Sequence, residues 1–216
     1  MRRGTFQDHT VDYAAVGASQ AADLMQYPPE QSVPAENAWR IGSGGERFTT
    51  ASEALLSWSA QREGGLTISD VRPAAGPAYT GVAYEEEGHP IAPSRLDSDQ
   101  RFDADGTPFV GPGTTVHLRG HVGRYRADAE ARVISVIEEP RRVGFALGTV
   151  GGSVVSGEEL FVLEWRDNDE VWFTVRAFDR PTALLYRVFP AMVRQRRREL
   201  FTRYLRAISP MYTTPA

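Results

Sequence analysis

Three stretches between residues 143 and 181 constrain the fold of this chain more than any other feature. Residues 143–150 are apolar and β-favouring, and in residues 159–165 and 171–178 successive side chains alternate in character. The turns between these stretches consist of Gly, Ser, Asp and Asn. A period of two bounded by such residues is typical of antiparallel strands with one buried face. We therefore predict a three-stranded meander, which Pro181 ends because proline cannot donate to the ladder.

The alternation assigns side chains to faces but leaves the inward face of the third stretch open. In the second stretch one face carries Phe161, Leu163 and Trp165. In the third stretch one face carries Val171, Phe173, Val175 and Ala177, and the other carries Trp172, Thr174, Arg176 and Phe178. Both faces of the third stretch therefore carry aromatic rings.

The start of the chain is expected to be irregular. Pro28, Pro29 and Pro34 oppose regular structure around them, so residues 1–40 are predicted to hold only a short helix at 12–22.

A second helix is predicted at residues 49–61. Its apolar face consists of Phe48, Ala51, Leu55 and Trp58, which lie three or four residues apart. Thr50 or Ser52 is expected to cap it, with Glu53 completing a capping box with Thr50.

Further strands are predicted at residues 66–71, 114–120 and 129–138. In the last of these, Ala131, Val133, Ser135 and Ile137 should share one face, and Glu130, Arg132, Ile134 and Val136 the other.

A long helix is predicted after Pro181, ending near residue 208 and kinked or divided at Pro190. Its apolar arc consists of Phe189, Val193, Leu200, Phe201, Tyr204, Leu205 and Ile208. Arg194 and Arg197 fall inside this arc, whereas Arg196, Arg198 and Arg206 fall outside it. An arginine at such a position must be paired, lie in a polar cavity, or extend its head to water. Contact of Arg197 or Arg194 with a ligand, and extension of these arginines into water, therefore remain open alternatives.

Residues 73–112 are rich in Pro, Gly, Asp and Glu and show little periodicity. A structureless stretch of this length inside a compact domain is usually functional or disordered. Tyr79, Tyr84, Phe102 and Phe109 give the stretch rings with which to dock, so a lid over a cavity and an inert insertion both remain open. Its carboxylates and His89 match no calcium-loop spacing, and no metal site is predicted.

The composition excludes several kinds of chemistry. The chain has 216 residues, 41% of them hydrophobic, and a formal net charge of -4, so no nucleic-acid partner is expected. No apolar run approaches a membrane span and no signal sequence is recognised, so we expect a cytoplasmic protein without a membrane partner. There is no cysteine, and all 24 basic residues are arginine. Thiol nucleophiles, thiolate zinc sites and lysine Schiff bases are therefore excluded, and no cofactor is expected.

The order of elements is a helix, a run of antiparallel strands and a long amphipathic C-terminal helix. This order predicts an α+β fold of the helix-grip type, in which a curved antiparallel sheet packs around the long helix. We expect one domain over residues 1–216, with the insertion at 73–112. The concave side of such a sheet often leaves a cavity.

Several motifs resemble a known family, the uncharacterised domain family DUF1990 (UPF0548). They are Gly144-Phe145, Gly148-Thr149, Ser156-Gly157-Glu158-Glu159, Val171-Trp172-Phe173, Ala177-Phe178 and Arg180-Pro181, with Ile41-Gly42-Ser43-Gly44 upstream. The resemblance implies a START-like (Bet v 1-like, SRPBCC) helix-grip fold, whose members hold apolar small molecules between sheet and helix. The chain departs from the family pattern at residues 150–153, where it lacks a histidine, and at Asp179, where serine is usual.

Two functional hypotheses share the expected cavity. The first is binding of an apolar or aromatic small molecule, with candidate contacts from Phe145, Trp165, Trp172, Phe173, Phe178, Arg197 and Tyr204. The second is a non-covalent acid–base enzyme, such as a cyclase, isomerase or dehydratase of secondary metabolism, with Glu158, Glu159, Arg176 and Asp179 as candidate catalytic residues. A third alternative is an interaction protein whose own side chains fill the cavity.

Adjacent residues on a strand point to opposite faces, so only one of Glu158 and Glu159 can face inward. A carboxyl group buried there would have a raised pKa and suit acid–base work. The structural alternative for Glu158 is an ion pair with Arg176 or a neighbouring arginine.

Overall fold

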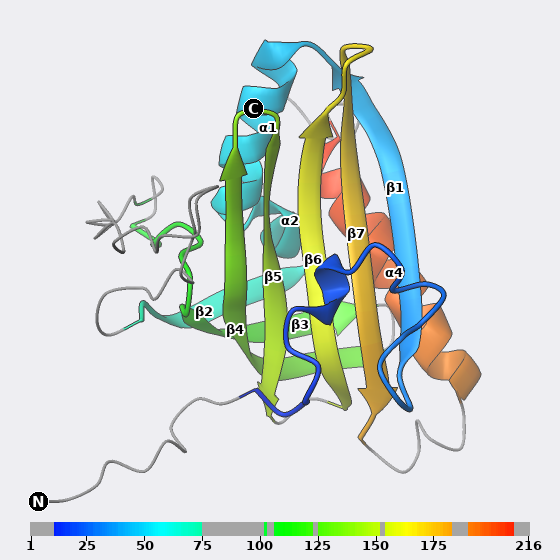
Figure 1. Ribbon diagram of the computed structural model, residues 1–216. Coiled ribbons are helices and arrows are strands. Elements are labelled where there is room, and N and C mark those ends of the chain that lie inside the picture. Colours follow the sequence, from blue (N-terminus) through cyan, green and yellow to red (C-terminus); the bar gives the residue numbers. More distant parts are fainter. Residues whose placement is uncertain are drawn as a thin grey trace, which may run out of the picture.

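The computed structural model describes residues 11–74, 102, 106–122, 125–151, 154–182 and 190–209, and its strands form one antiparallel sheet (Figure 1). The strand order is β1-β7-β6-β5-β4-β3-β2. The bounds are β1 Val33–Ser43, β2 Leu66–Arg72, β3 Thr115–Val122, β4 Tyr125–Glu139, β5 Arg142–Gly151, β6 Val155–Trp165 and β7 Glu170–Pro181. The predicted meander is confirmed as β5, β6 and β7, and the three further predicted strands as β2, β3 and β4.

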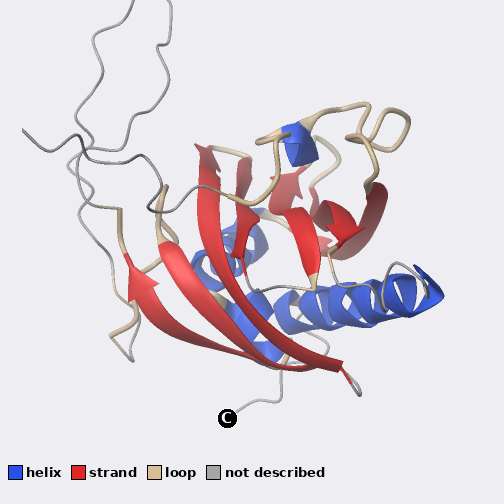
Figure 2. Ribbon diagram, turned by 90° about the horizontal axis from the view of Figure 1, so that it is seen from below, coloured by secondary structure: helices blue, strands red, loops and turns tan. Residues whose placement is uncertain are grey.

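The sheet curves around the helices on its concave face, as Figure 2 shows from below. The α-helices within the described ranges are α1 Gly45–Leu56, α2 Ser59–Glu63 and α4 Pro190–Ile208. This arrangement confirms the predicted α+β helix-grip fold. No helix in the described ranges is long and apolar enough to cross a membrane. The predicted kink at Pro190 cannot be followed upstream, since residues 183–189 lie outside the described ranges.

The prediction that residues 1–40 lack regular structure is wrong at β1. Pro34 lies within this strand, opposite Phe178 of β7. β1 is an edge strand with a partner on one side only, so a missing N–H is tolerated there. The expected helix at 12–22 is reduced to the 3₁₀ turn η1 Ala18–Gln20.

The predicted helix at 49–61 begins earlier than expected and is broken. The N-cap is Gly44, which has no side chain, so the predicted cap by Thr50 or Ser52 is wrong. The hydroxyls of Thr50 and Ser52 instead donate to backbone carbonyls within the helix. Trp58 adopts a left-handed conformation with φ of 68°, which separates α1 from α2. The fully buried Trp58 ring and its Nε1 bond of 3.0 Å to the Pro108 carbonyl hold this break in place.

A bulge in β4 makes the predicted assignment of faces wrong for the end of that strand. The register between β4 and β5 shifts between Val133 and Ser135. One extra residue reverses the alternation beyond it. Val136 therefore packs against the main core under the helices, while Ile137 joins a smaller cluster on the convex face with Leu160 and Val162.

The N-terminal segment, residues 11–32, crosses the convex face over β5, β6 and β7 (Figure 1). Leu24 of this segment is buried, and Arg176 of β7 donates to the Ala21 carbonyl at 2.9 Å. The sheet is thus covered on both faces, by helices on one side and by this segment on the other.

Gln61 of α2 is fully buried, and neither polar atom of its amide has a hydrogen-bond partner among the described residues. A buried polar group without a partner costs about 1–3 kcal/mol. Gln61→Met has a similar shape and removes both polar atoms, so it should raise the free energy of unfolding by about 1–3 kcal/mol. Urea denaturation measures the change, with the exposed Gln195→Met as the control. A loss of stability in Gln61→Met alone would contradict the prediction.

Candidate functional site

A pocket of about 100 Å³ lies between α4 and the concave face of the sheet. Its apolar wall comes from β2 to β5 and includes Leu66, Leu118, Ala127, Ala129, Ala131 and Leu147. Its polar side comes from β6, β7 and α4 and includes Glu159, Asp179, Arg196, Arg197 and Tyr204. The site therefore joins an apolar wall to a compact set of charged and hydroxyl groups.

Three alternate alanines of β4 create the space. Ala127, Ala129 and Ala131 face the helices, and the residues between them, Asp128 and Glu130, face away. Larger side chains at these positions would fill the space beneath α4. The alternation of alanine and charged residues at 127–131 indicates a pocket wall, but no such wall was predicted from the sequence.

The polar side is built around an ion pair between β7 and α4. Arg197 Nε lies 3.3 Å from one oxygen of Asp179, and its Nη2 lies 3.3 Å from the other. Arg197 also donates to the Val33 carbonyl at 2.7 Å, which links α4 to the edge strand β1. Only 7% of the Arg197 side chain and 13% of the Asp179 side chain are exposed. Arg197 is thus paired in the interior and does not extend its head into water.

Glu159 of β6 lies beside this pair and faces α4. Its Oε2 is 3.5 Å from the Tyr204 hydroxyl, at the long limit of a hydrogen bond. Burial raises the pKa of Glu159 to about 7, and the Asp179 carboxylate adds to the shift while Arg197, Arg196 and Tyr204 oppose it. A group that exchanges its proton near neutral pH is suited to acid–base work.

Burial also raises the pKa of Asp179, although Arg197 and Arg196 oppose the shift. The pKa of Tyr204 lies well above its usual value because of burial and the neighbouring Glu159 carboxylate. Tyr204 therefore stays a neutral hydroxyl at neutral pH.

Arg196 is a pocket residue that the sequence interpretation placed outside the apolar arc. Its Nε is buried, and that atom has no hydrogen-bond partner in the described part of the chain. Helical periodicity alone could not identify it, because it lies next to Arg197 at the margin of the buried face.

The structure separates Glu158 from Glu159 as the strand geometry predicted. Glu158 points to the convex face, where its carboxylate accepts hydrogen bonds from the Tyr13 hydroxyl at 2.7 Å and the Gly17 N–H at 2.8 Å. It also accepts bonds from the Ser19 N–H at 3.1 Å and from the Ser19 hydroxyl. The expected ion pair with Arg176 is wrong, since Arg176 pairs with Glu36 instead. Glu158 reaches the pocket boundary, but its oxygens are bound by the N-terminal segment.

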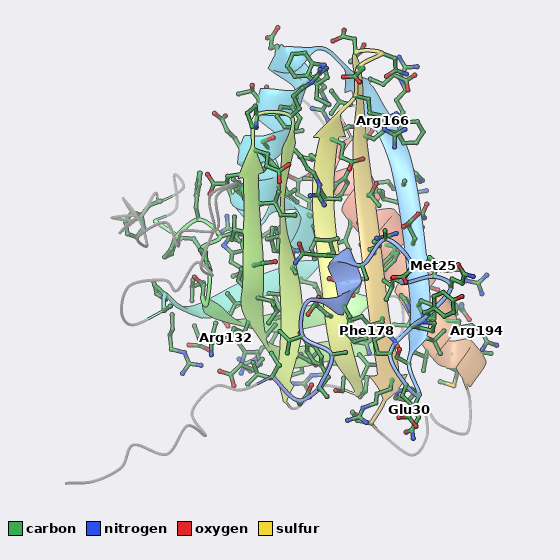
Figure 3. All side chains as sticks on the ribbon, viewed as in Figure 1. Met25, Glu30, Arg132, Arg166, Phe178 and Arg194 are labelled. Carbon is green, nitrogen blue, oxygen red and sulfur yellow. The ribbon has the colours of Figure 1, made fainter. Side chains whose placement is uncertain are left out.

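Three further predicted site residues lie on the convex face. Arg176 donates to Ala21 and pairs with Glu36. Trp172 lies beneath the Arg166 guanidinium, 4.4 Å from the ring centroid. Phe178, which Figure 3 labels, also reaches the pocket boundary. Its ring packs against Tyr13 of the N-terminal segment. Position alone therefore argues against a ligand contact by Trp172 and a catalytic role for Arg176.

The remaining predicted aromatic residues fill the core or lie far from the pocket. Phe145 and Phe173 are fully buried, and Phe145 stacks on Phe161 with centroids 5.1 Å apart. Trp165 stacks on Phe48 of α1 at the far end of β6. Of the predicted site residues, the structure brings Glu159, Asp179, Arg197 and Tyr204 together on the polar side of the pocket.

Most of the predicted insertion at 73–112, including Tyr79, Tyr84 and His89, lies outside the described residues, so a lid there is untested. Its described end docks on the helices, since the Val110 N–H bonds the Leu56 carbonyl at 2.8 Å and Phe109 packs against the core. Within the described ranges, no three His, Asp or Glu side chains are arranged to hold a metal ion.

Glu159→Gln should change how stability depends on pH. The folded state holds the Glu159 proton up to about pH 7, whereas the unfolded chain releases it near pH 4.5. Through Glu159 the wild type therefore loses stability as the pH rises between these values, and the variant lacks this contribution. We expect Glu159→Gln to be more stable by about 1–3 kcal/mol at pH 8 and nearly unchanged at pH 4. Urea denaturation across this range measures it, and parallel curves for variant and wild type would contradict it.

Comparison with known proteins reveals one family. The profile of a family described as "Domain of unknown function (DUF1990)" matches residues 12–96 and 97–207. A "UPF0548 protein" from Deinococcus radiodurans is 45% identical over 49 residues, which make up 23% of this chain and 25% of the relative. The chain thus spans about a quarter of the length of this curated relative.

Solved structures are similar to this chain at low sequence identity. The di-domain ARO/CYC BexL from the BE-7585A biosynthetic pathway matches with a TM-score of 0.50 and 9% identity, over 90% of this chain and 54% of that chain. Hypothetical protein jhp0584 from Helicobacter pylori matches with a TM-score of 0.49 and 9% identity, over 91% of this chain and 95% of that chain. At such identity the likeness to BexL concerns the fold alone.

Proposed function

Because the chain belongs to the DUF1990 family, whose function is not known, we propose its function from the pocket: it binds a small apolar or aromatic molecule between the sheet and α4. One observation carries this proposal. The alanines of β4 leave a space of about 100 Å³ with an apolar wall, next to charged groups that are already ordered by one another. Ligand sites usually combine a mostly apolar lining with a few placed polar groups.

The volume limits the size of the ligand. Pockets for drug-sized molecules usually measure about 300–1,000 Å³, and an apolar protein cavity of about 150 Å³ binds benzene. The pocket of about 100 Å³ therefore suits a molecule with a single ring or a short branched chain. A cytoplasmic location and a single domain over residues 1–216 belong to the same proposal.

Acid–base catalysis in the same pocket is the second candidate. The observation that favours it is the Glu159 carboxyl, with its pKa of about 7, beside the neutral Tyr204 hydroxyl. Glu159 would accept or donate the proton, and Tyr204 would donate a hydrogen bond to a substrate oxygen. This chemistry fits an isomerase, a dehydratase or a cyclase and needs no covalent intermediate.

Filling the pocket tests the binding function. Ala129→Phe places a benzyl group in the space below α4 and should abolish binding of toluene and phenol, measured by ligand-observed NMR. The matched control is Ala38→Phe on β1, opposite Thr174 and outside the pocket, which should bind as the wild type does. Thermal unfolding of both variants establishes that they remain folded.

Native mass spectrometry of protein purified from its host supplies the second measurement. A bound mass that is present in the wild type and absent in Ala129→Phe identifies the ligand. The proposal is wrong if neither probe binds the wild type, or if both probes bind Ala129→Phe as tightly as wild type.

A further inference from the structure

Arg196 is the pocket residue whose bonding is incomplete. Buried nitrogen atoms in folded proteins almost always have a hydrogen-bond partner, and unsatisfied ones require an explanation. The Nε of Arg196 is buried without a hydrogen-bond partner among the described residues, and the residue lines the pocket. Arg197, the next residue, is by contrast fully occupied by Asp179 and Val33.

The charges around the pocket leave an excess on the positive side. Arg197 and Asp179 form a pair that is neutral as a whole. Glu159 is the other carboxyl group on the concave side of the pocket, and burial with the Asp179 charge keeps part of it protonated near neutral pH. When Glu159 holds its proton, the described residues on the concave side of the pocket carry two arginine charges and one carboxylate charge, so one positive charge has no counterpart among them. An anionic group would supply both the missing acceptor and the missing charge.

The helix adds to this preference. Arg194, Arg196, Arg197 and Arg198 all lie in the N-terminal half of α4, and no acidic residue lies in its first turn. The N-terminal end of a helix carries a partial positive charge, which normally attracts acidic side chains. Here arginines increase the positive potential at the end of the helix that borders the pocket.

We propose that the natural ligand is a small apolar or aromatic acid, whose carboxylate or other anionic oxygen accepts hydrogen bonds from Arg196 while its ring or chain lies against the alanines of β4. This inference rests on the proposed binding function and specifies its ligand class. The planar guanidinium presents donors in a fork that matches two oxygens of a carboxylate. The apolar wall opposite selects against strongly hydrated anions such as free phosphate.

Benzoate and benzamide provide the test, because they have nearly the same shape and differ in charge. Isothermal titration calorimetry at pH 7 should show that the wild type binds benzoate at least about tenfold more tightly than benzamide. Arg196→Gln should remove this difference by weakening benzoate and leaving benzamide nearly unchanged. Arg196→Lys keeps the charge but not the fork, so it should retain part of the preference.

Arg194→Gln is the matched control, since Arg194 is an exposed arginine of the same helix outside the pocket (Figure 3). It should keep the preference for benzoate. Equal binding of benzoate and benzamide by the wild type, or an unchanged preference in Arg196→Gln, would overturn the assignment of Arg196 and leave the binding function intact. A loss of preference in Arg194→Gln alone would move the anion site to the outer surface of α4 and overturn the assignment too. Binding of neither probe would overturn both proposals.

Discussion

Arg197→Met should lower the free energy of unfolding by about 3–5 kcal/mol at pH 8, because it removes one partner of a buried ion pair. The Asp179 carboxylate would remain buried next to Glu159, without the guanidinium that contacts both of its oxygens. The Val33 carbonyl would also lose its donor, and with it the link between α4 and the edge strand β1. Urea denaturation monitored by tryptophan fluorescence measures the loss.

The loss should depend on pH in a defined direction. Without Arg197, the pKa of Asp179 in the folded state rises further above its value in the unfolded chain. A raised carboxyl pKa contributes stability at low pH that is lost as the pH rises through the folded value. Arg197→Met should therefore be less damaging at pH 4 than at pH 8.

Two variants isolate the pair as the cause. Arg194→Met removes an exposed arginine from the same helix and should change stability by less than about 0.5 kcal/mol. The double variant Asp179→Leu/Arg197→Met replaces both charges and should recover most of the loss. If Arg197→Met and Arg194→Met are equally stable at pH 8, the buried pair does not contribute as proposed.

The sheet was largely predictable because its information is local. Alternation along β5, β6 and β7, with turn residues between them, requires only neighbouring positions in the sequence. The same period of two established that Glu158 and Glu159 face opposite sides. It could not identify the inward one, since the partners of Glu158 lie about 140 residues upstream in a segment without periodicity.

The incorrect predictions concern features that no local sequence pattern reveals. β1 was missed because a proline-containing edge strand is specified by its pairing with β7, which no local pattern reveals. The bulge in β4 reversed the expected faces of Val136 and Ile137, and a bulge leaves no clear mark in an apolar run. The inward face of residues 171–178 stayed open because both faces carry rings, and no local pattern reveals the N-terminal segment that covers the convex face. Trp172 lies on that convex face, whereas Phe178 reaches the pocket boundary from it.

Glu158→Ala should release the N-terminal segment from the convex face and lower the free energy of unfolding by about 2–4 kcal/mol. The 1% exposed carboxylate is the common acceptor for Tyr13, Gly17 and Ser19. Removal of this carboxylate leaves the donors of Tyr13, Gly17 and Ser19 buried without an acceptor. The segment should therefore detach, because its donors can then bond to water. The decrease in the free energy of unfolding therefore cannot exceed the free energy with which the segment docks on the sheet. The sheet itself should remain folded.

Hydrogen exchange read by mass spectrometry distinguishes this local release from general destabilisation. Amide protection should fall in residues 11–27 and persist in β5 to β7. The control is Glu164→Ala, on the same strand and the same face, where Glu164 makes only exposed pairs with Arg142 and Arg166. It should cost less than about 1 kcal/mol and leave exchange in residues 11–27 unchanged. Unchanged protection of that segment in Glu158→Ala would show that other contacts hold it.

The two faces of β6 are coupled through a single peptide bond, which extends the prediction to the pocket. Glu158 fixes the backbone of β6 against the N-terminal segment, and Glu159, the next residue, presents its carboxyl group to Tyr204. Release of the segment should let this part of β6 move and separate Glu159 from Tyr204. Glu158→Ala should therefore weaken binding of benzoate and phenol although its side chain is on the opposite face, and Glu164→Ala should not. Unchanged binding in a variant whose segment has detached would show that the pocket is independent of the convex face.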